Sequence, residues 1–313
     1  MRDGAGLRRG SSKLMSWRQL SLTCPAAQLA EVEALMMELG ALSISLRDAG
    51  DEPIYEPLPG DTPVWPESVV SATFAEDSDP EQLAQLLLAR LPAPLSQTVT
   101  HGSFRDRDWQ QSYRQHFKPL QCAANLWIVP SWSEPPDPRA TIVRLDPGLA
   151  FGTGSHPTTA LCLAWLAQQE LTNLNLIDYG CGSGILAIAA IKLGAGRVLA
   201  VDIDEQALTA CRSNMAVNAV TPERIQVGQP EMIGETTTDL LMANILAGPL
   251  IELAARFAEL VIPGGKIVLS GILTSQLDDI QSTYDNFFEL DPCRQQGEWA
   301  CISGRRRFQV TDV

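Results

Sequence analysis

Asp178-Tyr-Gly-Cys-Gly-Ser-Gly184 lies between two apolar segments and is followed eighteen residues later by Asp202. The apolar residues within 174–177 predict a short buried strand, and 185–193, rich in alanine, leucine and isoleucine, predicts a helix. A strand, a glycine-rich turn, a helix and a second strand ending in an acidic residue form a half-site for a nucleoside-bearing cofactor. The alternative, a glycine turn without a ligand, is disfavoured because Asp202 lies where a ribose-binding carboxylate is expected.

One residue separates two classes of cofactor. The dinucleotide fingerprint G-x-G-x-x-G would place its third glycine at position 185, which is Ile185 here. The glycines are Gly180, Gly182 and Gly184, and this G-x-G-x-G spacing resembles motif I of the S-adenosylmethionine-dependent methyltransferases with a Rossmann-like core. The resemblance implies S-adenosyl-L-methionine as the cofactor. A nicotinamide-dependent oxidoreductase is the disfavoured alternative.

Length and composition are those of an ordinary globular protein with room for two domains. The 313 residues are 45% hydrophobic and 19% charged, and no apolar run has the length of a membrane span. The formal net charge of −14 disfavours naked nucleic acid as a partner, because phosphate neutralisation supplies much of the affinity for nucleic acids. A basic protein partner suits this charge, although a negative charge also simply keeps a protein soluble.

Three features of the sequence argue against a disulfide-bonded, a metal-binding or a secreted protein. The seven cysteines form no C-x-x-C pair and are expected to be reduced and mostly buried, as in a cytoplasmic protein. The three histidines have no metal-ligand spacing, so no metal site is expected. Residues 1–14 lack the apolar segment of a signal peptide and are expected to be an expression leader. They carry a net charge of +3, which leaves −17 on the rest of the chain.

A small α+β domain is predicted over residues 15–104, where apolar alternation marks strands and a helical period marks helices. The predicted elements are a strand at 20–24, a helix at 26–39, strands at 42–46 and 70–74, a helix at 81–91 and a weaker strand at 97–100. The five prolines within 50–66 predict a long irregular loop. The order β-α-β-β-α-β is that of a ferredoxin-like domain.

The remaining chain is predicted to contain a linker helix over 105–119 and a larger α/β domain over 120–313. The larger domain opens with strands at 126–129 and 141–145, which are expected to form an antiparallel pair around a proline-rich turn. Strands then alternate with helices, and the segments 287–290 and 299–303 close the chain as an antiparallel pair. This pattern predicts a mostly parallel seven-stranded sheet with one reversed strand, covered on both faces.

Three segments are expected to meet at the carboxyl edge of this sheet, where parallel-sheet proteins bind ligands. They are the glycine-rich turn, Asp202 and Asn244-Ile-Leu-Ala-Gly-Pro-Leu250. Asn244 ends an otherwise apolar strand, so its amide either caps the following turn or faces the site. Beside a cofactor motif, we favour the second interpretation.

A further loop makes the resemblance specific. With Phe151-Gly-Thr-Gly-Ser-His-Pro-Thr-Thr159, these segments resemble the PrmA family of ribosomal protein L11 methyltransferases, from Met15 to about Phe308. Asn244-Ile-Leu occupies the slot in which amine and amide methyltransferases carry Asn-Pro-Pro-Tyr, without the prolines and the tyrosine. The resemblance implies that the cofactor is bound by Thr159, Gly180, Asp202 and Asn244.

The resemblance also implies the substrate. It implies trimethylation of lysine side chains and of the α-amino group of the large-subunit ribosomal protein L11, with the small N-terminal domain presenting that protein. No direct nucleic-acid or membrane partner is expected, and the chain is expected to act as a monomer in the cytoplasm.

Asn244 is the expected catalytic residue. Only a neutral amine has the lone pair that attacks a sulfonium methyl group, whereas lysine has a pKa of about 10.4 and an α-amino group one of about 7.7–8.0. A less polar site favours the neutral form of lysine, so no dedicated strong base is expected. We expect the side-chain carbonyl of Asn244 and nearby backbone carbonyls to accept hydrogen bonds from the amine and aim its lone pair at the methyl group.

Neighbouring polar residues are given separate roles. Asp202 is expected to bind ribose, and Asp204 to be a solvated or helix N-terminal carboxylate. His156 either donates a hydrogen bond in the site or is a structural loop residue. Thr159 either offers its hydroxyl to the cofactor or bonds to its own backbone. The glycines of the 151–159 loop are expected to let it fold over the methionine part of the cofactor.

Two other functions are compatible with parts of this pattern. Another protein, nucleic-acid or small-molecule methyltransferase would share the same core, since specificity lies elsewhere in such folds. A non-enzymatic nucleotide- or RNA-binding module is opposed by the acidic charge and by the lack of a clear RNP-type aromatic run.

Overall fold

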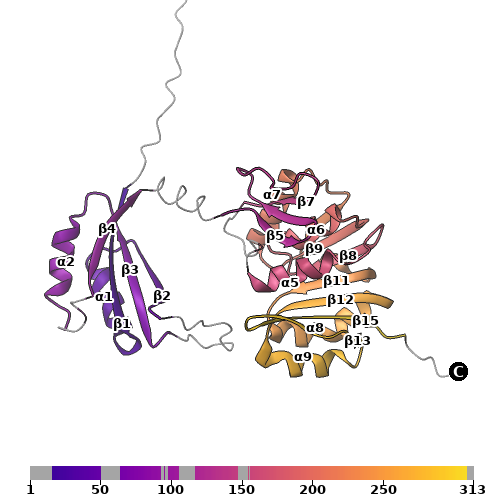
Figure 1. Ribbon diagram of the computed structural model, residues 1–313. Helices are drawn as coiled ribbons and strands as arrows, with labels where there is room; N and C mark the ends of the chain where they lie inside the picture. Colours follow the sequence, from indigo (N-terminus) through magenta and orange to yellow (C-terminus); the bar gives the residue numbers. More distant parts are fainter. Residues whose placement is uncertain are drawn as a thin grey trace, which may run out of the picture. The chain divides into compact units, whose positions relative to one another are not determined.

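The computed structural model describes residues 16–50, 64–92, 95, 98–105, 117–146, 154 and 156–308, and it divides into two compact units between His116 and Phe117 (Figure 1). The expected leader, most of the proline-rich loop, part of the 151–159 loop and residues 106–116 of the predicted linker helix lie outside the described residues, and the described residues of that linker, 105 and 117–119, are not helical. Each unit is described by itself.

The first unit has the predicted ferredoxin-like order. Its elements are β1 (Ser16–Pro25), α1 (Leu29–Glu38), β2 (Ser43–Asp48), β3 (Glu67–Phe74), α2 (Pro80–Leu88) and β4 (Thr100–Arg105). The four strands form one antiparallel sheet in the order β2-β3-β1-β4. The fourth strand was predicted at 97–100 but begins at Thr100, because its backbone pairs with Ser16–Ser21 of β1. Pairing with a distant strand is not visible in local apolar alternation.

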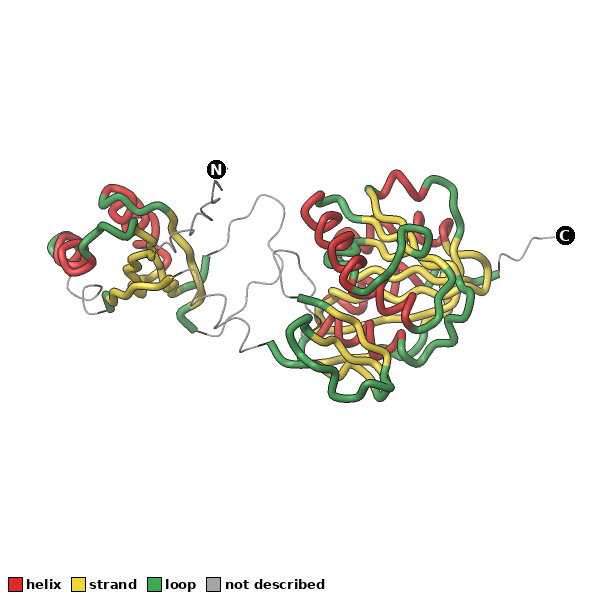
Figure 2. Tube along the Cα trace, turned by 90° about the horizontal axis from the view of Figure 1, so that it is seen from above, coloured by secondary structure: helices red, strands yellow, loops and turns green. Residues whose placement is uncertain are grey.

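Both helices of this unit pack on the same face of its sheet (Figure 2). Alternate residues of the two central strands supply the apolar face: Leu20, Leu22, Cys24, Val70, Ala72 and Phe74. Met36 of α1 and Leu87 of α2 are fully buried against them. Asp79 is the N-cap of helix α2, since its side chain accepts hydrogen bonds from the N–H groups of Glu81 and Gln82.

The second unit is built on a large, mostly parallel sheet. Its strands are β8 (Asn175–Tyr179), β9 (Arg197–Val201), β10 (Ile225–Gly228), β11 (Thr238–Asn244), β12 (Val261–Leu273), β13 (Phe288–Leu290), β14 (Arg294–Gln296) and β15 (Trp299–Arg306). Seven of them follow the order β10-β9-β8-β11-β12-β15-β13, and β15 runs antiparallel to both neighbours, as predicted. The short strand β14, which pairs with β15, was not predicted.

Helices cover both faces of this sheet (Figure 1). They are α5 (Pro157–Leu166), α6 (Ile185–Lys192), α7 (Glu205–Val217), α8 (Ala247–Leu260) and α9 (Leu277–Tyr284). In β11, Leu240 and Met242 join the core formed with α5, α6 and α7, whereas Leu241 and Ala243 join the core formed with α8 and α9. A strand buried on both sides needs apolar residues at every position, which explains the continuous apolar run. Within the described residues, no helix is both long and apolar enough to cross a membrane.

The prediction for the entry to this unit was wrong. The segments 126–129 and 141–145 were predicted to be antiparallel, but β6 (Leu126–Val129) and β7 (Thr141–Arg144) are parallel. The antiparallel partner of β6 is β5 (Leu120–Ala123), which lies across a two-residue turn. The connection between β6 and β7 is long enough to carry the chain back to the edge at which β6 begins, so that β7 runs in the same direction as β6. The prolines of this connection therefore do not form a hairpin turn.

The glycine-rich turn is required by the fold itself. Gly180 and Gly184 have φ angles of 73° and 76°, in the left-handed region that favours glycine. A Cβ at Gly180 would collide with the side chain of Ile245, and one at Gly184 would collide with the sulfur of Cys211. The contacts of Ile245 and Cys211 therefore exclude a larger residue at these two positions, whether or not a ligand is bound.

Replacing Gly184 with alanine is expected to lower the free energy of unfolding by about 2–4 kcal/mol, because the change adds left-handed backbone strain and overpacking. Cys211→Ala removes the sulfur that the new Cβ would meet. The double variant should therefore lose about 1 kcal/mol less than the sum of the two single variants. Urea denaturation followed by circular dichroism measures all three. Additive losses would show that Cys211 is not the obstacle.

Candidate active site

The glycine-rich turn is attached to the end of the neighbouring strand β9. The N–H groups of Gly180 and Cys181 both donate to the carbonyl oxygen of Val201, at 2.8 and 2.9 Å. The next N–H, that of Gly182, donates to Oδ2 of Asp202 at 2.9 Å. Three successive backbone donors are thus fixed to two successive residues. The turn and the acidic residue that follows β9 consequently form one rigid corner.

Asp202 and Asp204 have different surroundings. Oδ1 of Asp202 accepts the N–H of Asp204 at 3.0 Å, and each Asp202 oxygen keeps further acceptor capacity for a ribose hydroxyl. Asp204 caps helix α7, since its Oδ1 accepts the N–H of Gln206 at 2.9 Å. Asp204 is therefore the helix N-terminal carboxylate that the sequence predicted.

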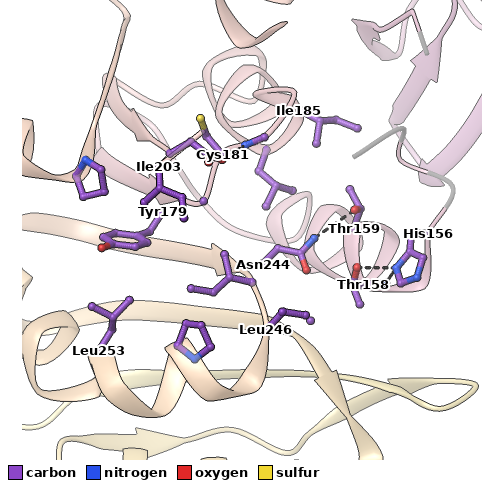
Figure 3. Close-up of a pocket in the computed structure, with 18 of the residues that line it drawn as sticks. His156, Thr158, Thr159, Tyr179, Cys181, Ile185, Ile203, Asn244, Leu246 and Leu253 are labelled. Carbon is purple, nitrogen blue, oxygen red and sulfur yellow. Dashed lines mark hydrogen bonds between the residues drawn. The ribbon is translucent and has the colours of Figure 1, made fainter. Parts of the chain in front are cut away.

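Asn244 and Thr159 lie against each other at the carboxyl end of β11 (Figure 3). Asn244 Nδ2 donates to Thr159 Oγ1 at 3.2 Å. Thr159 is 1% exposed, and its hydroxyl contacts this amide rather than its own backbone. Asn244 lines a pocket instead of capping a turn, and no described residue bonds to its Oδ1. One amide group is thus anchored by its nitrogen and presents its oxygen.

His156 has the structural role that was one of its two predicted alternatives, and its ring also reaches the cavity. It is the N-cap of α5: its Nδ1 lies 2.8 Å from Thr158 Oγ1 and accepts the N–H of Thr158 at 3.4 Å. Burial lowers the pKa of its imidazole, which favours the neutral form. The ring also lines the pocket and contacts Trp299 edge to face, with 4.9 Å between ring centroids. A structural cap therefore also forms part of the site wall.

These residues surround a single cavity of about 530 Å³. All four predicted cofactor-binding positions, Thr159, Gly180, Asp202 and Asn244, line it. The walls are mostly apolar, and Asp202 is the only charged residue among the described lining. The other lining residues were not singled out from the sequence, although several lie in segments expected at the site: Thr158, Tyr179, Cys181, Leu186, Ile203, Pro230, Ile245, Leu246, Pro249, Leu253, Gly271 and Trp299.

Some of the missed residues carry a sequence signal and others do not. Ile203 stands between the carboxylates Asp202 and Asp204, is 84% exposed and lines the cavity. Leu246 and Pro249 lie within the Asn244–Leu250 segment that was already expected at the site. Trp299 comes from the reversed strand β15, so its place depends on the order of strands in the sheet.

Beneath the turn, Asp178 is an unusual buried acid. It is 1% exposed, its Oδ2 accepts the N–H of Ala187 at 3.0 Å, and its Oδ1 has no hydrogen-bond partner among the described residues. Burial raises the pKa of this carboxyl to about 7, assisted by the nearby charge of Asp202, while the Ala187 hydrogen bond acts in the opposite direction. Asp178 therefore titrates near neutral pH.

The described residues fit a nucleoside-bearing cofactor. Asp202 supplies acceptors after β9, Asn244 supplies an amide oxygen two strands away at the end of β11, and most of the other described lining residues are apolar. This arrangement at the carboxyl edge of a mostly parallel sheet is that of a Rossmann-like class I methyltransferase. The profile of the family described as ribosomal protein L11 methyltransferase (PrmA) matches residues 16–307. The chain belongs to this family, as the resemblance predicted.

Individual relatives agree over nearly the full length. Proteins named ribosomal protein L11 methyltransferase from Teredinibacter turnerae and Hahella chejuensis are 44% and 46% identical, covering 94% and 93% of this chain and 98% and 99% of their own. A crystal structure of ribosomal protein L11 methylase from Lactobacillus delbrueckii subsp. bulgaricus is 35% identical, with a TM-score of 0.57. It covers 61% of this chain and 100% of its own. The predicted enzyme class, a methyltransferase, is confirmed.

Asp202→Ala is expected to weaken binding of S-adenosylmethionine by about 10- to 100-fold, because it removes charged acceptors that ribose hydroxyls would use. Asp204→Ala should change that affinity less than about threefold while lowering the free energy of unfolding by about 1 kcal/mol, since it removes a helix cap. Isothermal titration calorimetry and urea denaturation test the two variants side by side. Equal losses of affinity would contradict the assignment.

Asp178 should make the stability of the empty protein depend on pH. Because its pKa is raised in the folded state, folded molecules keep the proton between about pH 4 and 7 while unfolded chains lose it, so stability falls as the pH rises through this range. Relative to Asp178→Asn, the wild-type protein should lose about 2–4 kcal/mol of unfolding free energy between pH 4.5 and 8. Urea titrations at several pH values measure it. A pH-independent difference would refute the assignment.

Proposed function

We propose that this chain transfers methyl groups from S-adenosylmethionine to amines of the large-subunit ribosomal protein L11, namely lysine side chains and the α-amino group. The observation that carries the proposal is the amide oxygen of Asn244, anchored through Thr159 and presented to an apolar cavity. The names of the full-length relatives support the identity of the substrate protein.

Four residues of this chain would hold the cofactor. Asp202 would accept hydrogen bonds from ribose, Gly180 would bring the backbone close to it, and Thr159 with Asn244 would lie further along the cavity, at the end of β11. When bound, S-adenosylmethionine supplies a methyl group on a sulfonium centre. Asp178, directly before the turn, and Cys181, within it, are buried.

The acceptor amine would be positioned rather than deprotonated by a strong base. The mostly apolar walls favour the neutral form of an amine that enters the cavity. Asn244 Oδ1 accepts a hydrogen bond from the amine and thereby orients its lone pair, and its nitrogen is held by Thr159 so that it does not rotate away. His156, whose Nδ1 is occupied by Thr158, keeps the start of α5 in place.

The small unit is proposed to present the substrate protein in the cytoplasm, where ribosomal proteins are made. Within the predicted organisation, residues 15–104 form this recognition domain and 105–119 the linker. The formal net charge of −14 supports a basic protein rather than a nucleic acid as the partner.

The decisive measurement uses tritiated S-adenosylmethionine with ribosomal proteins from a methylation-deficient strain. The wild-type chain should label one large-subunit protein, at lysines and its α-amino group. Asn244→Ala should lower turnover about 100-fold at saturating cofactor, because the amine loses its positioning acceptor. Thr159→Val should lower turnover more than Thr159→Ser, which keeps the anchoring hydroxyl.

Each alternative has its own result. Label in no ribosomal protein would sink the substrate assignment, and label in RNA would redirect it to nucleic-acid methylation. Turnover of Asn244→Ala within a few-fold of wild type would remove the proposed role of that amide.

A further inference from the structure

Trp299 forms part of the cavity wall at the edge that faces away from Asp202. It is the first residue of β15 and pairs with Leu273 at the end of β12. Its indole contacts the His156 ring at an interplanar angle of 70°, which restricts how the indole is oriented. The position of this aromatic side chain follows from the reversal of β15, which brings the start of that strand to the edge where parallel strands end.

The order of strands places Trp299 beyond Asn244. Across the sheet the order is β9, β8, β11, β12 and β15, so Asp202 follows the first of these strands, Asn244 ends the third and Trp299 begins the fifth. Neighbouring strands are about 4.8 Å apart, so β15 lies about 10 Å from β11 and about 19 Å from β9. Trp299 therefore lies on the side of Asn244 that is opposite the predicted ribose end.

Hydrogen bonds hold this part of the cavity together. The Ser270 hydroxyl lies 3.1 Å from the carbonyl oxygen of Thr158 and 3.2 Å from that of Ala300. Ser270 is fully buried, so it joins the start of α5 to β12 and β15. The Thr159–Asn244 pair and the indole next to Ala300 thus belong to one framework.

The charge produced by the reaction needs a partner here. When an amine takes the methyl group, an N–C bond forms as the S–C bond of the sulfonium breaks, and the positive charge moves from sulfur to nitrogen. The nitrogen then releases a proton to solvent before the next transfer. The single carboxylate among the described lining residues, Asp202, is at the far end of the cavity.

Hydrogen-bond acceptors stabilise the positive charge on the nitrogen less with every methyl group that is added. Each transfer replaces one N–H of the amine, so Asn244 Oδ1 has fewer donors to accept from, and a trimethylated nitrogen has none. An indole attracts a cation through its ring electrons and requires no N–H. An aromatic wall is therefore suited to the later, more methylated states.

We propose that Trp299 is a specificity-determining residue that receives the acceptor nitrogen and stabilises its positive charge through its indole, so that the number of methyl groups added depends on it. The inference rests on the proposed function of the cavity. Trp299 would stabilise the di- and trimethylated states of the nitrogen, which have the fewest N–H groups to donate to Asn244 Oδ1.

The first test measures binding alone, by nuclear magnetic resonance titration of the indole N–H signals with S-adenosylhomocysteine present. The probes are acetyl-Nε-trimethyl-lysine amide and its neutral carbon isostere, which has a tert-butyl group. The signal that Trp299→Phe removes should shift, and the cationic probe should bind about 3- to 30-fold more tightly than the isostere. Trp299→Leu should abolish this preference. Equal affinity of the two probes for the wild-type protein would overturn the proposal.

The second test reads the products by mass spectrometry. Trp299→Leu should slow the second and third transfers more than the first and so accumulate mono- and dimethylated amines, and Trp299→Phe should restore most trimethylation. Trp132→Leu is the matched control, since Trp132 is 36% exposed outside the cavity. An unchanged product distribution in Trp299→Leu would refute the role of Trp299. So would a loss of affinity for S-adenosylmethionine as large as the loss of trimethylation. A wild-type chain that methylates no amine would instead sink the proposed function, and the binding test would still decide the role of Trp299.

Discussion

The attachment of the glycine-rich turn to the end of β9 is the constraint on which the rest of the site depends. Three successive N–H groups are fixed to Val201 and Asp202, so the turn cannot move without moving the acidic residue. Helix α6 starts from this turn and packs its apolar side into the main core. Much of the remaining wall is brought to the same edge by α5, α8, the ends of β11 and β12 and the start of β15. A small number of backbone hydrogen bonds thus sets the position of a large cavity.

Much of the fold follows from patterns that a sequence displays locally. The continuous apolar run of β11 predicts a strand covered on both faces, and the convergence of Asp202 with Asn244 follows because parallel strands end at one edge. Strand direction across long connections is not local, which is why β7 was assigned the wrong orientation. Trp299 was missed for the same reason. Its place in the site depends on which strand is reversed and where that strand lies in the sheet.

The cavity separates two electrostatic environments. At one end the Asp202 carboxylate meets backbone N–H groups, and at the other the described polar groups near Asn244 are neutral. A carboxylate beside the acceptor would favour a protonated, unreactive amine, whereas a neutral amide and apolar walls favour the free base. If the acceptor amine binds beside Asn244, as proposed, no described lining residue there offers the product cation an ionic partner. In the proposed function, neutral groups in rigid positions would both keep the amine unprotonated and stabilise the product cation.

Because of the buried carboxyl of Asp178, the reactivity of the acceptor amine and the stability of the fold change in opposite directions with pH. Amines become better nucleophiles as the pH rises, but the cofactor-free fold loses stability between about pH 4 and 7, where folded Asp178 still holds a proton that unfolded chains have lost. A ligand that binds only the folded state offsets such a loss by mass action. The enzyme is consequently most dependent on bound cofactor for its survival in the alkaline conditions that make its acceptor most reactive.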